Sequence, residues 1–313
     1  MTDPAPPALI DAAPTHVGDG AAPVCPNCAT ERLGDYCHGC GQRELGGRLT
    51  FRRVWGEFAS RAFNLDRGLL HTVVSLARSP GAVPRDYVEG RRRTYTNPLS
   101  FLLLTAAFGL LTMGLYEAEM REQMRSVAAV QQGEQEATHA GHDHADEPNP
   151  FEAHFGSEEA VVVAVLEEWM AVIKRWTTYL TLLLCVPLVA LLRVLFGPAR
   201  NVAELSVFAL YTVGLGTLVT AVIMPPIVHA RWTMSPWFMV LGVGLYVAIT
   251  AWGVVRFYDE RPVGAALRGA AAMTVAYGVY LVVVSVFGAA VAFFRIAEEV
   301  GLSPAEVVER LAT

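Results

Sequence analysis

The chain has few charged residues. Asp, Glu, Lys and Arg make up 17% of its 313 residues, whereas soluble domains average about 25%. Hydrophobic residues make up 53%, and the mean hydropathy is +0.36. A soluble protein of this length needs a charged surface, which so few ionisable side chains cannot supply. The composition excludes a disordered chain, argues against an ordinary cytosolic enzyme and favours a membrane protein with polar segments outside the bilayer.

Catalytic motifs are also missing. The sequence contains no Gly-x-Ser-x-Gly, no phosphate-binding loop and no His-Glu-x-x-His. We therefore expect a protein that is not an enzyme. We also expect no signal peptide, because residues 1–23 have neither a basic start nor an apolar core of about 7–15 residues. Their Pro, Ala and Asp content predicts a disordered tail, and the first membrane span is then an internal signal anchor.

Five uncharged apolar stretches are long enough to cross a bilayer, which takes about 20 residues in a helix. Asn97 and Pro98 form a typical helix start at the first of them. The predicted fold is an all-α membrane protein with a transmembrane domain at 98–296 and a short C-terminal helix at 297–313. The predicted spans are 98–116, 176–196, 205–229, 236–257 and 268–294.

Basic residues are concentrated on one side of these spans. Residues 48–97 have a net charge of +6, whereas residues 117–175 have a net charge of −9. The loop between the third and fourth spans contains Arg231 alone, but two arginines lie in or beside the loop before the third span, and three lie in or beside the loop after the fourth. Basic loops stay in the cytoplasm. We therefore predict a multi-pass protein of the inner (plasma) membrane, with a cytoplasmic N-terminus and a periplasmic or extracellular C-terminus.

Four cysteines form the sharpest local motif, with two Cys-x-x-Cys pairs separated by eight residues: Cys25, Cys28, Cys37 and Cys40. Two such pairs form knuckles whose thiolates converge on one structural Zn²⁺. Gly39 and Gly41 are expected to supply the left-handed turns of a knuckle. Residues 24–44 are thus predicted to be a cytoplasmic zinc ribbon, with a redox pair or an iron–sulfur site as the alternatives. The fifth cysteine, Cys185, is expected to be an apolar filler in the second span.

The surface of this ribbon carries balanced charge. Arg32 and Arg43 are matched by Glu31, Asp35 and Glu44. A nucleic-acid-binding surface should be basic, so we expect no nucleic acid as a partner. A closed four-thiolate site also leaves no open position for catalysis. Docking of an unknown protein partner is the favoured role.

A basic, amphipathic segment at 48–97 precedes the first span. Apolar residues recur at helical spacing between Phe51 and Leu76, while arginines lie largely off that stripe. This pattern is typical of an interfacial helix, or of a helix whose apolar stripe packs on the bundle. Residues 84–90 predict a short helix that begins at Pro84. The predicted surface for anionic lipid or a partner consists of Arg85, Arg91, Arg92, Arg93 and Tyr95.

Several short motifs in this region resemble a known family. They are Cys40-Gly41-Gln42, Phe63 to Gly68 (FNLDRG), Pro80-Gly81, Asp86 to Tyr95 (DYVEGRRRTY) and Asn97-Pro98. Together they resemble bacterial domain-of-unknown-function family 3667, whose members are inner-membrane proteins with a short N-terminal zinc ribbon. The resemblance implies that architecture and no activity.

A His-rich run (THAGHDHADE) lies in the predicted acidic loop 117–156. His139, His142 and His144 could bind a metal ion weakly. Their spacing fixes no coordination geometry, so a solvated linker is favoured. The function favoured by the sequence is a non-enzymatic docking or scaffold protein. The alternative is a transporter or channel for a metal ion or small solute, although the span centres lack the ionisable groups that such proteins usually keep there.

Overall fold

The computed structural model describes residues 24–32, 34–43, 49–52, 68–123, 125–126, 154, 158–232 and 235–301. The chain divides into two units, Met1–Gly46 and Gly47–Thr313. Three predictions lie outside the described residues: the disordered tail, the metal-binding role of His139, His142 and His144, and most of the C-terminal helix.

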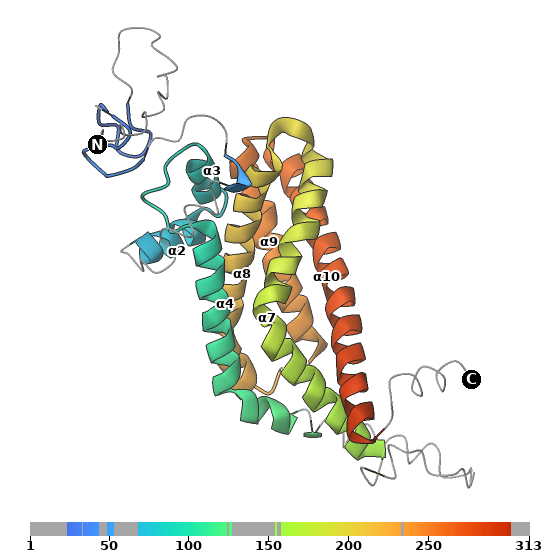
Figure 1. The fold of residues 1–313 in the computed structure, drawn as a ribbon. Helices are drawn as coiled ribbons and strands as arrows, with labels where there is room; N and C mark the ends of the chain where they lie inside the picture. The colour runs from blue at the N-terminus through green and yellow to red at the C-terminus, as the bar shows by residue number, and fades with distance from the viewer. Residues whose placement is uncertain are drawn as a thin grey trace, which may run out of the picture. The chain divides into compact units, whose positions relative to one another are not determined.

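The second unit is built from helices (Figure 1). Two short helices come first, α2 (Gly68–Arg78) and α3 (Ala82–Val88). The five long helices that follow are α4 (Pro98–Leu115), α7 (Glu158–Phe196), α8 (Val202–His229), α9 (Pro236–Tyr258) and α10 (Pro262–Glu299). A short 3-10 turn, Gly197–Ala199, joins α7 to α8.

All five long helices are long and apolar enough to cross a membrane, which confirms the predicted fold class. Their ends lie within three residues of the predicted spans, except in α7 and α10. α7 begins at Glu158 rather than at residue 176, and α10 runs from Pro262 to Glu299 rather than from residue 268 to residue 294. A search for apolar stretches identifies only the part of a helix that lies in the hydrocarbon core of a bilayer. The helix itself continues beyond that core among polar residues.

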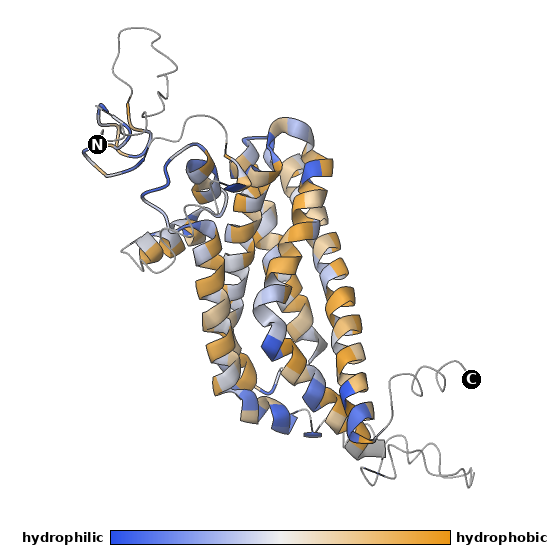
Figure 2. Cartoon of the chain, in the orientation of Figure 1, coloured by the Kyte–Doolittle hydropathy of each residue, from blue (hydrophilic) through white to orange (hydrophobic). Residues whose placement is uncertain are grey.

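The charged residues mark the ends of the apolar zone. On α7 the uncharged stretch lies between Arg175 and Arg193, a rise of about 27 Å at 1.5 Å per residue. That length matches the roughly 30 Å hydrocarbon core of a bilayer. Figure 2 shows apolar residues along most of the length of the helices, with polar residues toward the two ends of the bundle and part-way along α7.

α8 is the central helix of the bundle. It packs against α4, α7 and α9, and α10 packs against α7 and α9. Two glycines in α8 permit this packing: a Cβ on Gly214 would lie 2.8 Å from Cδ1 of Phe101, and one on Gly216 would lie 2.4 Å from Cε1 of Tyr246. Small residues at such contacts let membrane helices approach closely.

The predicted loop at 117–156 begins later than expected, because residues 117–123 are helical. Glu117 forms ion pairs with Arg121, one turn away, and with Lys174 of α7. These two cations lower the pKa of Glu117, the Lys174 hydrogen bond most strongly. Nε2 of Gln123 also donates to the carbonyl oxygen of Val228 at 2.9 Å. Contacts to the bundle thus extend helical structure into a segment whose composition resembles a linker.

Candidate functional site

The four cysteines lie in two knuckles with the same backbone hydrogen bonds. In the first, the Ala29 amide donates to the Cys25 carbonyl at 2.9 Å, and the Cys25 amide donates to the Thr30 carbonyl at 2.9 Å. In the second, the Gly41 amide donates to the Cys37 carbonyl at 2.7 Å, and the Cys37 amide donates to the Gln42 carbonyl at 2.9 Å. An antiparallel bridge closes each knuckle, Val24 with Glu31 and Tyr36 with Arg43. The module is therefore an internal repeat.

One residue in each knuckle has a left-handed backbone. Gly41 has φ +70°, as predicted, but its equivalent in the first knuckle is Ala29, with φ +57°. The expectation for Gly39 is wrong, since its φ is not positive. Gly39 is instead required by space, because a Cβ there would lie 2.8 Å from Oγ1 of Thr30. Spacing from the cysteines, rather than residue type, would have identified Ala29.

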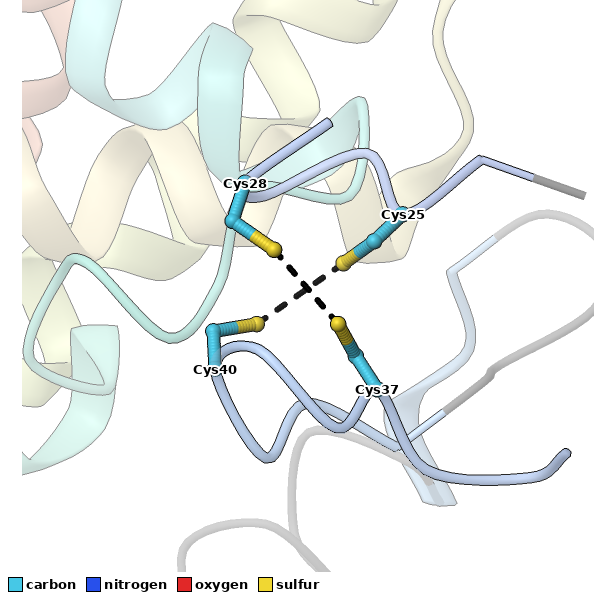
Figure 3. A group of neighbouring side chains, drawn as sticks. All are labelled: Cys25, Cys28, Cys37 and Cys40. Atoms are coloured by element: carbon cyan, nitrogen blue, oxygen red, sulfur yellow. Dashed lines mark hydrogen bonds between the residues drawn. The ribbon is translucent and has the colours of Figure 1, made fainter. Parts of the chain in front are cut away.

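The four sulfur atoms converge on a common centre (Figure 3). Sγ of Cys28 lies 3.4 Å from Sγ of Cys37, and Sγ of Cys25 lies 3.7 Å from Sγ of Cys40. All four lie within 4.8 Å of one another. None is disulfide-bonded. A tetrahedral Zn²⁺ with Zn–S bonds of about 2.3 Å requires sulfur–sulfur distances of about 3.8 Å, so this donor set fits a metal ion of that size.

The sulfurs differ in their surroundings. Cys25 and Cys37 are buried, whereas Cys28 is exposed. Hydrogen bonds with the Thr30 side chain and backbone lower the pKa of Cys28 to about 6. Burial raises the pKa of Cys40 to about 12. A bound divalent cation deprotonates a coordinating thiol, and the lowered pKa of Cys28 favours its thiolate form at neutral pH.

The described part of the basic segment packs on the helical bundle. α2 buries Thr72 and Leu76, and α3 buries Val83, Pro84 and Tyr87. α3 contacts α8 and α9 (Figure 1). The apolar stripe was predicted either to lie at the membrane surface or to pack on the bundle. Residues 68–88 pack on the bundle, and residues 53–67 lie outside the described part.

α3 begins in very close contact with α9. A Cβ on Gly81 would lie only 1.9 Å from the carbonyl oxygen of Gly253. The short helix begins at Ala82, two residues before the predicted start at Pro84. Gly90, with φ +110°, ends this region in a conformation that favours glycine. Steric constraints thus explain why glycine occupies both positions. Gly81 also sets the distance between α3 and the bundle.

The predicted lipid or partner surface is only partly exposed. Arg92 is 5% exposed, and its Nε donates to the Tyr87 carbonyl at 3.2 Å, so its prediction as a surface residue is wrong. Arg85 is ion-paired with Glu89 at 2.9 Å and with Asp259 at 3.5 Å. A run of arginines cannot reveal which guanidinium turns inward to a backbone carbonyl.

Two other residues of that surface, Tyr95 and Arg91, lie against Asp86. The Tyr95 hydroxyl donates to its carboxylate at 2.9 Å, and Arg91 lies 3.5 Å from it. Burial is the main reason that the pKa of Tyr95 rises to about 12. Arg91 and Arg93 are exposed. These two arginines are therefore the exposed cations of the predicted surface.

A buried polar network that the sequence did not predict joins α2, α4 and α8. The Tyr211 hydroxyl donates to the Thr96 carbonyl, and the Thr96 amide donates to Oγ1 of Thr72 at 2.9 Å. Asn97 caps α4 through the Leu99 amide, as predicted, and its Nδ2 donates to the Tyr87 hydroxyl at 3.4 Å. The sequence feature that could have revealed this network is Tyr211, which lies inside a predicted span, because a buried hydroxyl needs a hydrogen-bond partner.

Residues 66–109 match the model of a family described as a protein of unknown function, DUF3667. The match confirms the family resemblance over α2, α3 and the first part of α4. The four cysteines lie outside the matched residues. No curated protein and no solved structure matches the chain.

Proposed function

We propose that this protein is a non-enzymatic docking protein of the inner membrane, in which one structural Zn²⁺ stabilises the four-cysteine module and the module binds a protein partner. The observation that carries this proposal is the convergence of four thiol sulfurs from two equivalent knuckles. Such a closed site has no open coordination position for a substrate. Its role is then to hold a small surface in shape.

Zinc is favoured over the alternatives by the donor set. Four cysteine sulfurs at near-tetrahedral distances suit Zn²⁺, which favours tetrahedral sulfur coordination and has no redox chemistry. A module of about 20 residues buries too little apolar surface to fold by itself, so metal binding must supply much of its folding free energy.

The charge around the cysteines favours a protein as the partner. In the described module, Arg32 and Arg43 are balanced by Glu31 and Asp35. Tyr36 is 60% exposed and Val24 is 55% exposed. A neutral surface with an exposed aromatic side chain is typical of protein recognition, whereas nucleic acid requires a basic one.

The membrane orientation proposed with this function follows from the arginines. The bundle end at which α4, α8 and α10 begin carries Arg85, Arg91, Arg93, Arg200, Arg261 and Arg268. The opposite end combines cations with Glu117, Glu167 and Glu168. The basic end is then cytoplasmic, which places the N-terminus in the cytoplasm and the C-terminus outside.

Metal analysis and cross-linking together test this proposal. Full-length protein purified from its native membrane should contain one Zn²⁺ per chain, and Cys25→Ser or Cys40→Ser should remove it. The matched control is Cys185→Ser, which removes a thiol outside the module and should keep the metal. Stoichiometric iron, or an ordered module without metal, would contradict zinc.

The docking part is tested by cross-linking in native membranes from residues of the module. A specific protein should cross-link to the wild type and to Cys185→Ser at equal yield, and at much lower yield to Cys25→Ser. If every cross-linked protein is recovered equally from Cys25→Ser, the module is not the docking site.

A further inference from the structure

A groove with a volume of about 670 Å³ opens between α4, α7 and α8. Its walls are apolar side chains from all three helices, including Leu99, Val186, Val189, Val207 and Leu210. The hydroxyl of Ser206, which also lines the groove, already donates to the Val202 carbonyl at 2.9 Å. The groove therefore offers hydrocarbon contacts and little hydrogen bonding.

The groove is about one lipid leaflet deep. Along α7 its lining residues extend from Leu182 to Arg193, a rise of about 16 Å at 1.5 Å per residue. Half of the hydrocarbon core of a bilayer is about 15 Å. Its outer end lies at the bundle end where α7 finishes and α8 begins, since Val202, the first residue of α8, also lines it.

Arg193 is the one charged residue among the described residues that line the groove. Three other arginines at this end are ion-paired: Arg85 and Arg200 with Glu89, and Arg268 with Glu260. Among the described residues, Arg193 forms no ion pair, and its side chain is exposed. An apolar slot of leaflet depth with an uncompensated cation at its outer end fits an amphiphile with an anionic head.

We propose that this groove binds one acyl chain of an anionic phospholipid, with the Arg193 guanidinium paired to the lipid phosphate. Apolar pockets of several hundred Å³ with a single fixed polar group are the usual form of such sites, and basic residues between membrane helices at the cytoplasmic side bind anionic headgroups. This inference does not depend on the proposed docking function, because none of the residues that line the groove belongs to the four-cysteine module.

A photoactivatable phosphatidylglycerol with a mid-chain diazirine tests the site directly. Full-length protein in phosphatidylcholine nanodiscs is cross-linked to this probe and the labelled peptides are mapped by mass spectrometry. Label should concentrate on residues 182–193 and 202–210. Unlabelled phosphatidylglycerol should compete better than phosphatidylcholine with the same chains. Label spread evenly over the exposed faces of α9 and α10 would overturn the proposal.

Two variants with matched controls separate the headgroup from the chain. Arg193→Gln should weaken competition by phosphatidylglycerol about fivefold, the effect of one cation near an anionic surface, while Arg261→Gln at the same bundle end should not. Val186→Trp fills the groove and should abolish labelling there. Val194→Trp, on the same helix but outside the groove lining, should leave it unchanged. Wild-type labelling of both Arg193→Gln and Val186→Trp would refute the site.

Discussion

Ala29 and Gly41 occupy the same position in two knuckles, with φ +57° and φ +70°. A residue with a Cβ is disfavoured in this conformation by about 1–2 kcal/mol, whereas glycine is not. Gly41→Ala should therefore destabilise the second knuckle by that amount, less the roughly 0.4–1 kcal/mol that removing a glycine recovers by lowering the entropy of the unfolded chain. A Cβ on Gly41 meets nothing within 4 Å, so the backbone conformation is the sole cost.

This cost should appear as a loss of metal affinity, because folding of the module and metal binding are coupled. The net change of about 0.5–1.5 kcal/mol corresponds to about 2- to 13-fold in a dissociation constant. Competition between the full-length protein and a zinc chelator at fixed pH measures it. Ala29→Gly should act in the opposite direction by a similar factor, because the strain that it relieves is likewise offset in part by the added entropy of the unfolded chain.

The control is Gly34→Ala, also in the module. Gly34 has no positive φ, and a Cβ there meets nothing within 4 Å. Its zinc affinity should not fall below that of the wild type, because an unstrained alanine only lowers the entropy of the unfolded chain. The reasoning fails if Gly41→Ala binds zinc as tightly as the wild type, or if Gly34→Ala loses as much affinity.

Three further predictions concern the membrane unit. Gly81→Ala should lower the free energy of unfolding in detergent by about 1–3 kcal/mol, since its Cβ would overlap the Gly253 carbonyl; Gly278→Ala, which meets nothing within 4 Å, should not. Tyr211→Phe should lower the free energy of unfolding in detergent by about 1 kcal/mol, because the hydrogen bond to Thr96 is lost. An unchanged midpoint of thermal unfolding would contradict the network. A periplasm-active reporter fused after residue 140 should be active and one fused near Arg261 silent; activity at Arg261 would reverse the orientation.

The four-cysteine cluster was predictable from the sequence because its geometry is local. Hydrogen bonds within each knuckle fix the two Cys-x-x-Cys pairs, a short connection joins them, and all four sulfurs lie within 4.8 Å of one another. The exception was Gly39, whose φ is not positive. Glycine has two uses, left-handed backbone and close approach, and residue type does not distinguish them.

The five long helices were predictable for a different reason. In a bilayer, every backbone polar group must be paired within the helix, so length and apolarity suffice to identify a span. The ends of α7 and α10 were not predictable from apolarity, because outside the bilayer a helix depends on caps and on ion pairs such as that of Arg295 with Glu168, 3.0 Å apart.

The basic segment shows where a one-dimensional pattern stops being informative. Arg91, Arg92 and Arg93 are adjacent and chemically identical, yet Arg92 is buried against Tyr87 while its two neighbours are exposed. Tyr87 is itself fixed by contacts with Asn97, the cap of α4, and with Tyr211 of α8, which is distant in sequence. The position of each guanidinium is therefore decided by tertiary packing. The same holds for Arg193. In the sequence it resembles any other arginine at the end of a span, one turn before the end of α7. Its place at the outer end of an apolar groove follows only from the packing of α4, α7 and α8.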